Sequence, residues 1–267
     1  MELCVLNSGS SGNCTFIASG GTAILIDAGI SRTAIQKRLA DLGRDLGQIA
    51  AILFTHEHTD HCWALPMVAA RYPGIALYAN EGTAESIDLA LEPELRKRKT
   101  GPFTWNVFET GRGFEIGDLA IEPFPIEHDA GEPVGYVVSD GSARVAIATD
   151  LGIVTEVVRR HLKDCDALVL EANHDVEMLK ASSRPPSLVQ RIGGRHGHLS
   201  NYAAGDLLAA VAGDRLRFVL PAHLSGDCNR PELAEAAFRS ALRALHLEKR
   251  VEIVPTFRDG ASRNLVL

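Results

Sequence analysis

The sequence predicts an α/β protein whose core is two β-sheets with helices on both outer faces. Short apolar runs bracket helical segments in both halves of the chain, and no linker or low-complexity tract interrupts them. The stretch 103–149 offers strand hairpins without helices, which fits a doubly wound parallel sheet less well. A chain of 267 residues can bury one large core, so we expect a single domain over residues 1–267.

Apolar runs bounded by turn residues predict the strands. In chain order they are Leu3–Leu6, Thr15–Ala18, Thr22–Ile26, Ile49–Thr55, Ala76–Tyr78, Phe103–Phe108, Leu119–Phe124, Val134–Ser139, Arg144–Thr149, Ala167–Leu170, Arg217–Leu220 and Val251–Pro255. A Gly/Ser loop at Asn7–Asn13 joins the first two strands, and Gly20-Gly21 joins the next pair. The run Ile49–Thr55 leads directly into a histidine-rich segment, so it is predicted to be a buried strand that positions this segment.

Apolar residues at helical spacing predict the helices. In chain order they are Arg32–Leu42, His61–Tyr72, Val154–Leu162, Tyr202–Ala212 and Pro231–Leu245. Ser31 is a plausible N-cap of the first, and Pro231 starts the last, where a helix tolerates proline. The longest apolar run, Ile49–Phe54, is far shorter than the ~18 residues of a membrane helix, so we expect no membrane span.

Charge and cysteine usage restrict the class of protein. Lys+Arg 27 against Asp+Glu 34 gives a net charge of −7, which excludes binding of nucleic acid by bulk charge but permits a local basic patch. The 5 cysteines are scattered and form no CxxC pair, which indicates reduced thiols. The N-terminus lacks the basic and apolar regions of a signal peptide. We therefore expect a cytoplasmic location.

The strongest functional signal is the segment His56–His61, which reads HEHTDH directly after a predicted strand. It holds three of the 10 histidines of the chain, and imidazole and carboxylate are the ligands that Zn²⁺ and similar ions prefer. A loop that leaves a strand can aim successive side chains at different sides of a cavity, so His56 and His58 can share one ion while Asp60 and His61 reach another. A solvated polar turn is the alternative.

Three further candidates lie singly at the ends of later predicted strands. They are His128, Asp150 and His223. A lone histidine at a strand end is more often a hydrogen-bonded surface residue, and an aspartate before Leu-Gly is more often a turn residue. Their order after the HEHTDH segment favours the metal interpretation.

The segment matches the HxHxDH signature of the metallo-β-lactamase fold superfamily, and the rest of the chain resembles that superfamily in order. The resemblance implies an αββα sandwich of two mixed β-sheets flanked by helices. It implies two divalent ions (Zn or Mn, with Fe possible). His56, His58 and His128 would hold the first, Asp60, His61 and His223 the second, and Asp150 would bridge them. Asp27, which ends the strand Ile24–Ile26, would orient the metal loop.

The number of predicted ligands suits two ions better than one tetrahedral zinc. Two ions about 3.5–4 Å apart can hold the attacking and leaving oxygens of an in-line phosphoryl displacement. They also lower the pKa of a bridging water toward neutrality, which supplies hydroxide as the nucleophile. Asp60 is expected to be a catalytic residue as well as a ligand.

Other segments resemble one branch of the superfamily, the WalJ/YycJ-type exonucleases. They are the loop 8–13, the HDA at 128–130, EANHD at 171–175, GHLSN at 197–201, and HLS with CN at 223–225 and 228–229. The match spans residues 3 to about 265. It implies a cytosolic 5′ to 3′ exonuclease of double-stranded DNA without sequence specificity, with relatives among ribonucleases Z and J and cyclic phosphate diesterases.

Two histidines of these segments are candidate catalytic residues. Related phosphodiesterases carry a histidine in a place comparable to His198 that meets the scissile phosphate or protonates the leaving oxygen. The alternative is that Ser200 or Asn201 caps the following helix with His198 beside it. His174 has a similar catalytic role or orders its loop through Asp175.

The expected substrate-binding residues come from polar loops and one basic set. They are Ser10, Asn13, Arg184, Arg191, Arg195, Ser225 and Asn229. The Gly/Ser loop can donate backbone N–H groups to a phosphate, and the arginines lie between the EANHD and GHLSN segments together with Lys180. The other basic run, Arg96–Lys99, is more typical of a solvated helix end.

Two other classes of function stay open at this point. The first is a hydrolase of a small ester, thioester or cyclic phosphate, which a closed apolar pocket would favour over an open basic groove. The second is a metal-binding regulatory protein without turnover, which the complete ligand set argues against. The sequence leaves the native metal, DNA against RNA, and the oligomeric state undecided.

Overall fold

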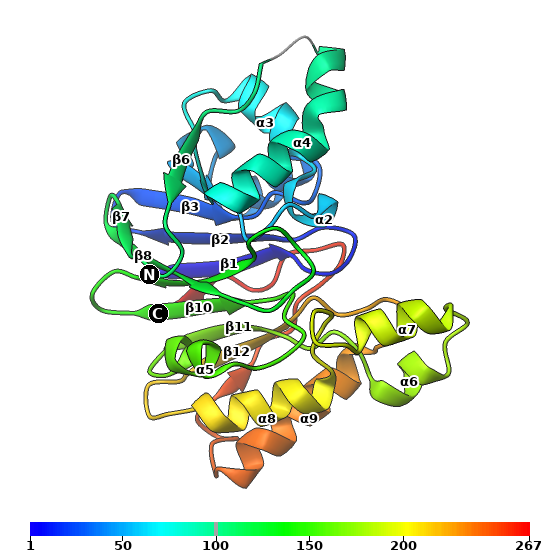
Figure 1. Ribbon diagram of the computed structural model, residues 1–267. Helices are drawn as coiled ribbons and strands as arrows, with labels where there is room; N and C mark the ends of the chain where they lie inside the picture. The colour runs from blue at the N-terminus through cyan, green and yellow to red at the C-terminus, as the bar shows by residue number, and fades with distance from the viewer. Residues whose placement is uncertain (99–100) are drawn as a thin grey trace. The chain divides into compact units, whose positions relative to one another are not determined.

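The computed structural model describes residues 1–98 and 101–267 and confirms the predicted α/β class (Figure 1). The strands form two mixed sheets of seven strands each, flanked by helices. By its internal contacts the chain divides into two compact units. Unit 1 comprises residues 1–122, 130–134 and 257–267, and unit 2 comprises residues 123–129 and 135–256. The expectation of one domain over the whole chain stays a prediction.

Unit 1 contains the first sheet, whose strand order is β14-β1-β2-β3-β4-β5-β6. Its strands are β1 (Glu2–Asn7), β2 (Cys14–Ser19), β3 (Thr22–Ile26), β4 (Ala51–Leu53), β5 (Ala76–Asn80), β6 (Trp105–Phe108) and β14 (Leu265–Val266). Its helices are α1 (Arg32–Asp41), the 3₁₀ turn η1 (Leu46–Gln48), α2 (Thr59–Cys62), α3 (Leu65–Arg71) and α4 (Glu81–Arg98). Phe16, Ile35, Leu65 and Ile87 belong to one buried cluster that joins strands to helices.

Unit 2 contains most of the second sheet, whose strand order is β13-β12-β11-β10-β9-β8-β7. The strands are β7 (Phe114–Ile116), β8 (Leu119–Pro125), β9 (Val134–Ser139), β10 (Arg144–Ala148), β11 (Ala167–Glu171), β12 (Phe218–Ala222) and β13 (Glu252–Ile253). The helices are α5 (Glu156–Leu162), α6 (Val176–Lys180), α7 (Pro186–Ile192), α8 (Asn201–Val211) and α9 (Pro231–Ala244). Leu168, Leu208 and Phe238 belong to a second buried cluster.

The two sheets repeat one layout. In the first sheet β14, β1, β2 and β3 pair antiparallel, and β3, β4, β5 and β6 pair parallel. In the second sheet β7 pairs with β8 and β9 with β10 antiparallel, and β10, β11, β12 and β13 pair parallel. Each sheet therefore has a parallel half, and the carboxyl ends of parallel strands are the common position of functional residues in α/β proteins.

The elements differ from the sequence prediction at identifiable places. The helix predicted at His61–Tyr72 is divided into α2 and α3, and Pro66 lies in the first turn of α3. Helix α4 was not predicted as an element, although Ala84, Ile87, Leu91 and Leu95 lie at helical spacing on both sides of Pro93. Only its C-terminal end was expected, as the solvated helix end at Arg96–Lys99. The predicted N-cap is confirmed, since the Ser31 side chain accepts the N–H of Ala34 at 3.2 Å.

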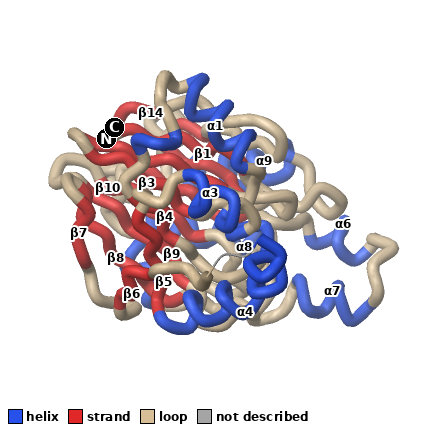
Figure 2. The backbone as a smooth tube through the Cα atoms, turned by 90° about the horizontal axis from the view of Figure 1, so that it is seen from above, coloured by secondary structure: helices blue, strands red, loops and turns tan. Residues whose placement is uncertain are grey.

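Helices α6 and α7 were also missed, and they project from the rest of unit 2 as an arm (Figures 1 and 2). We call residues 176–192 the arm. Of its side chains in helices, that of Leu179 is buried and none of those in α7 is. Their apolar residues are too few to give a clear helical pattern. Over the residues that the structure describes, no helix combines the length and the apolar character that a membrane crossing requires.

Candidate metal centre

The predicted site residues of each unit lie at the carboxyl ends of its parallel strands. In unit 1, Asp27 follows β3, and His56 lies three residues beyond the end of β4. In unit 2, Asp150 follows β10 after one residue, Glu171 is the last residue of β11, and His223 follows β12. Because such strand ends meet at one edge of a sheet, the fold gathers residues that are far apart in sequence.

Three of these residues have a left-handed backbone conformation. Asp27, Asp150 and His223 have φ values of 63°, 59° and 54°. Aspartate and histidine are among the few non-glycine residues that adopt this region, which costs free energy and is concentrated at functional sites. Each strand therefore turns sharply at the residue that contributes a side chain to the site.

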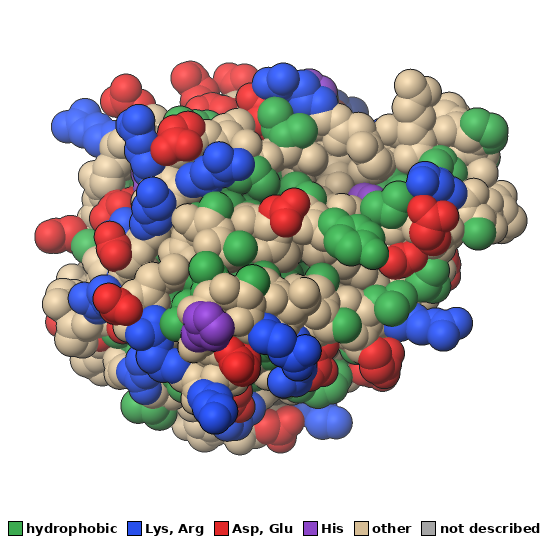
Figure 3. All heavy atoms as spheres, turned by 90° about the horizontal axis from the view of Figure 1, so that it is seen from below, with side chains coloured by type: hydrophobic (Ala, Val, Ile, Leu, Met, Phe, Trp, Pro, Cys, Tyr) green, Lys and Arg blue, Asp and Glu red, His purple; other side chains and the backbone are tan. Residues whose placement is uncertain are grey.

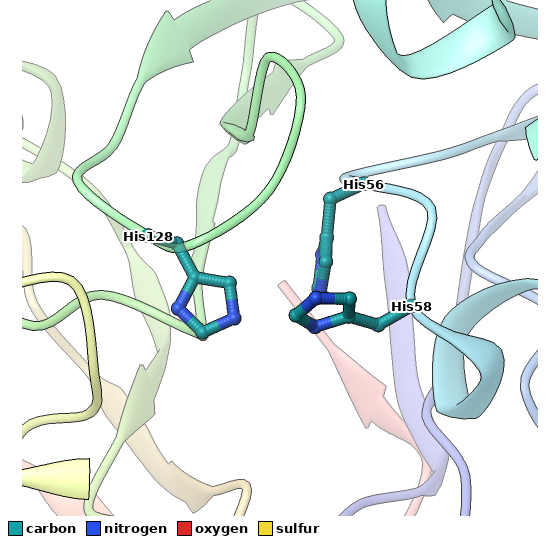
Figure 4. A group of neighbouring side chains, drawn as sticks. All are labelled: His56, His58 and His128. Atoms are coloured by element: carbon teal, nitrogen blue, oxygen red, sulfur yellow. The ribbon is translucent and has the colours of Figure 1, made fainter. Parts of the chain in front are cut away.

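The histidine-rich loop of unit 1 brings its side chains together. The side chains of His56 and His58 point toward one another (Figure 4). Their ring centroids are 4.5 Å apart with an interplanar angle of 75°. The His56 and His61 centroids are 4.1 Å apart, and His61 Nε2 lies 3.6 Å from Asp60 Oδ2. His58 is the N-cap of α2, so the start of this helix holds the remaining ligands on its first turn.

Asp27 orients this loop through a buried hydrogen-bond network. Its Oδ1 accepts the Thr55 N–H at 2.9 Å, its Oδ2 accepts the Thr55 hydroxyl at 2.9 Å, and its Oδ2 lies 2.7 Å from His61 Nδ1. Because the hydroxyl proton goes to Asp27, the Thr55 oxygen accepts from His56 Nδ1 at 3.0 Å. Burial raises the pKa of Asp27, and His61 and Thr55 oppose that rise. Asp27 therefore holds the loop that follows β4, and its role in orienting metal ligands stays a prediction.

The loop is locked to its neighbours by close backbone contacts. A Cβ on Gly29 would lie 1.6 Å from the Asp60 carbonyl oxygen, so this position admits no side chain. The Asn13 N–H donates to the same oxygen at 2.7 Å. Asn13 itself is buried, and its Nδ2 lies 3.0 Å from His61 Nε2 and 3.3 Å from Asp60 Oδ2. The structure thus places Asn13 against two predicted ligands, while Ser10 is exposed.

The predicted ligands of unit 2 converge on one carboxylate oxygen. Asp150 Oδ1 lies 4.0 Å from His128 Nε2 and 3.2 Å from His223 Nδ1. His128, which is also drawn in Figure 4, has its Nδ1 3.1 Å from the carbonyl oxygen of Gly197. Since a carbonyl only accepts, Nδ1 carries the proton and Nε2 presents its lone pair.

Glu171 is a site residue to which the sequence assigned no role. It is fully buried, and its Oε1 lies 2.9 Å from both His198 Nδ1 and His223 Nδ1. Its Oε2 accepts the N–H groups of Leu151 and Leu199 at 3.0 and 3.1 Å. Burial alone would raise the pKa of Glu171, but His198 and His223 hold it well below its usual range. The sequence feature that could have identified Glu171 as a site residue is its position at the start of the EANHD segment.

His198 and His174 have different environments. His198 is partly exposed; burial lowers its pKa, but the Glu171 carboxylate raises it overall. His174 is buried, which lowers its pKa, and its Nδ1 has no hydrogen-bond partner among the described residues. Ser200 caps α8 by accepting the Ala203 N–H at 3.2 Å, so the cap and the Glu171–His198 contact exist together.

The polar residues predicted to bind substrate in the HLS and CN segments are engaged in the fold. Asn229 is buried, and its Nδ2 donates to the carbonyls of Ala172 and Asn173 at 2.8 and 3.1 Å. The Ser225 hydroxyl accepts the Cys228 N–H at 3.1 Å. Both residues therefore order the loop after β12, and a substrate-binding role for them stays a prediction.

The three predicted phosphate-binding arginines form ion pairs with carboxylates of their own unit. Arg184 pairs with Asp227 at 3.0 Å, Arg191 with Asp129, and Arg195 with Glu127 at 3.6 Å. On the face shown in Figure 3, basic and acidic side chains are interspersed. Arg184 and Arg191 of the arm, and Arg195 beyond it, therefore leave this part of unit 2 less positive than its arginine content suggests, because each has a carboxylate beside it.

The other predicted basic run behaves as expected of a solvated helix end. Arg96 and Arg98 end helix α4 and pair with Glu92 and Glu94 at 2.6 and 2.7 Å, at the i,i+4 spacing. Lys99 lies outside the described residues.

The histidines fit divalent metal ions by their hydrogen bonding. His56, His61, His128 and His223 each have Nδ1 beside an acceptor, which leaves Nε2 as the donor atom to a metal. Metal-binding histidines almost always have their second nitrogen fixed in this way. Neutral imidazoles with aspartates are the ligand set that suits zinc and similar ions.

Known proteins are similar to this chain in sequence and in fold. A family model described as "Beta-lactamase superfamily domain" matches residues 22–223. Exodeoxyribonuclease YycJ of Bacillus anthracis is 33% identical over 91% of this chain and 89% of its own length. Exodeoxyribonuclease WalJ of Streptococcus pneumoniae is 36% identical over 86% of this chain and 84% of its own. The crystal structure of the metallo-β-lactamase fold protein YhfI of Bacillus subtilis covers 99% of this chain and 98% of its own, with a TM-score of 0.71 at 13% identity, which confirms the expected fold.

We predict that Asp27→Asn weakens divalent metal binding about 10- to 100-fold, because an amide cannot accept from both Thr55 and His61. The measurement is a competition titration of Zn²⁺ against a chelator. Asp118→Asn is the matched control, since the Asp118 carboxylate accepts the Gly21 N–H at 2.8 Å in a turn of the same unit. Equal affinity in the two variants would contradict the role assigned to Asp27.

Proposed function

Since this chain belongs to the metallo-β-lactamase superfamily and to its YycJ/WalJ branch, and is a metal-dependent hydrolase, we propose that it degrades nucleic acid. The specific proposal is a cytoplasmic 5′ to 3′ exonuclease that acts on double-stranded DNA ends without sequence specificity. The relatives named exodeoxyribonuclease support it. The structural observation that carries it is the buried Glu171 carboxylate, which holds His198 beside the predicted ligands Asp150 and His223.

The proposed ligand set is the one that the family resemblance implies. His56, His58 and His128 would hold one ion, Asp60, His61 and His223 a second, and Asp150 both. When bound, such ions supply Lewis acidity and water of lowered pKa for attack on phosphorus. We also propose that residues 1–267 form one catalytic domain.

The chain's own residues position and protonate the substrate in this proposal. His198 has Nδ1 on Glu171, so its Nε2 is the atom that would give a proton to the leaving oxygen. Glu171 stabilises the charged ring and fixes its orientation. His174, which is buried near the same carboxylate, is the second candidate for contact with the phosphate. Arg184, Arg191 and Arg195 would each have to exchange a carboxylate for a phosphate to bind DNA.

The test of the proposed function is a degradation assay on the full chain. End-labelled single- and double-stranded DNA and RNA are incubated with the protein in Zn²⁺ or Mn²⁺, with a chelator-treated sample as the control. We expect shortening of duplex DNA from its 5′ ends, and loss of that activity in the chelator. Turnover of a small ester or cyclic phosphate without degradation of any nucleic acid would instead support the alternative hydrolase.

We expect Asp150→Ala to lower metal occupancy at both proposed sites, because Asp150 Oδ1 lies beside both His128 and His223. Metal analysis of the purified variant checks this. The control is Asp140→Ala, which removes a carboxylate that accepts the Ser142 N–H at 2.9 Å in a turn of unit 2. A variant that still holds two ions tightly would rule out the bridging role of Asp150.

For His198→Ala we expect nearly unchanged metal content and turnover reduced about 10²- to 10⁴-fold, which is the usual contribution of a general acid. Metal analysis and steady-state rates on duplex DNA are measured together. His161→Ala serves as the control, since that ring bonds to the Val157 carbonyl within helix α5. Loss of metal along with activity would make His198 a ligand, and normal turnover would leave it only a structural role.

A further inference from the structure

The segment that ends the arm lies directly on the loop that carries His128. We call residues 191–197 the clamp segment and residues 127–129 the His128 loop. Two hydrogen bonds to backbone carbonyls join them: the Asp129 N–H donates to the His196 carbonyl at 3.1 Å, and His128 Nδ1 donates to the Gly197 carbonyl at 3.1 Å. The clamp segment therefore fixes both the backbone beside the predicted ligand and the protonated nitrogen of its ring.

The approach of these segments depends on two glycines. A Cβ on Gly152 would lie 2.2 Å from the Arg195 carbonyl oxygen and 2.6 Å from the Gly197 nitrogen. A Cβ on Gly197 would lie 2.2 Å from the carbonyl oxygens of both Arg191 and Ile192. The Gly152 N–H also donates to the Glu127 carbonyl at 2.9 Å. Both positions are closed to any side chain, because the groups that they would meet are backbone atoms.

Two ion pairs join the same segments on either side of the predicted ligand. Arg191 pairs with Asp129, and Arg195 pairs with Glu127 at 3.6 Å. These two carboxylates are the immediate neighbours of His128 in the chain. The arginines that the sequence assigned to phosphate are therefore bound to the loop that carries a metal ligand.

The clamp segment also continues directly into His198. The His198 N–H donates to the Ile192 carbonyl at 2.8 Å, and its ring bonds to Glu171. The clamp segment thus orients the ring of His128, a predicted metal ligand, and holds the backbone of His198, the proposed proton donor.

From these contacts we propose that residues 191–197 are a positioning element for His128. The Gly197 carbonyl sets the tautomer and orientation in which His128 binds a metal, and Arg191 and Arg195 are positioning residues that hold its loop. The inference rests on the proposed function in that it takes His128 as a metal ligand. It assigns Arg191 and Arg195 to holding the loop of a metal ligand, instead of to direct contact with DNA.

The first test compares alanine substitutions at two glycines of the clamp segment. Gly197→Ala forces the backbone of the clamp segment to move, whereas Gly193→Ala is tolerated, because its Cβ would meet the Val189 carbonyl at an ordinary 3.6 Å and its φ is −85°. We expect Gly197→Ala to weaken Zn²⁺ binding about 10- to 100-fold, with Gly193→Ala unchanged. The Co²⁺-loaded protein should show an altered ligand-field spectrum only in Gly197→Ala.

The second test removes the ion pairs and does not depend on the glycine variant folding. The double variant Arg191→Gln with Arg195→Gln should weaken Zn²⁺ binding about two- to ten-fold, since partly exposed pairs contribute modestly. The matched control is Arg215→Gln with Arg250→Gln, which removes pairs to Asp166 and Asp214 elsewhere in unit 2. Exchanging the charges, as Arg191→Asp with Asp129→Arg, should restore part of the affinity that Arg191→Asp alone loses.

Two outcomes overturn the proposal. One is Zn²⁺ affinity in Gly197→Ala equal to that in Gly193→Ala. The other is an Arg191→Gln, Arg195→Gln protein with normal metal affinity and a raised KM for duplex DNA, which would make these arginines phosphate contacts. Metal binding is measured without substrate, so a protein that shows the predicted affinity changes but degrades no nucleic acid refutes the proposed function alone.

Discussion

Four of the five predicted histidine ligands depend on a hydrogen bond at one ring nitrogen. Asp27 holds His61, the Thr55 hydroxyl holds His56, the Gly197 carbonyl holds His128, and Glu171 holds His223. In every case Nδ1 is occupied, so the same nitrogen of each ring is left to bind a metal. An imidazole without such a partner would rotate and exchange tautomers, and its affinity for metal would fall.

Two buried carboxylates, Asp27 and Glu171, provide much of this orientation, and their pKa values are shifted in opposite directions. Asp27 has one histidine neighbour, and burial raises its pKa. Glu171 has two histidines and two backbone N–H donors, and its pKa falls below the usual range. Burying a carboxylate costs several kcal/mol unless charge and hydrogen bonds compensate, and both residues have such partners here.

The fold supplies these partners by using one layout twice. Each sheet passes from antiparallel to parallel pairing, and each parallel half ends in residues with left-handed backbone conformations. Asp27 in the first sheet and Asp150 in the second occupy such turns. In both units, close backbone approach at glycine holds a ligand loop in place: Gly29 against Asp60, and Gly152 against the clamp segment. The precision of the centre therefore comes from backbone packing as much as from the ligands themselves.

The sequence by itself determined the α/β class, most strands, and the identity of the candidate ligands. Strand periodicity and the HxHxDH spacing involve residues that are close in the chain, so they can be recognised from the sequence without knowledge of the fold. It did not predict α4 beyond the helix end at Arg96–Lys99, since Pro93 interrupts the helical pattern of apolar residues there, and it did not predict the short helices of the arm. Only the tertiary structure revealed that Glu171 joins His198 to His223, that Asn13 and Asn229 are buried, and that Arg191 and Arg195 bind carboxylates beside His128. Glu171 lies 27 and 52 positions from His198 and His223, and Arg191 lies 62 positions from Asp129. A contact across such a distance is decided by how the strands pair and turn, which no local pattern records.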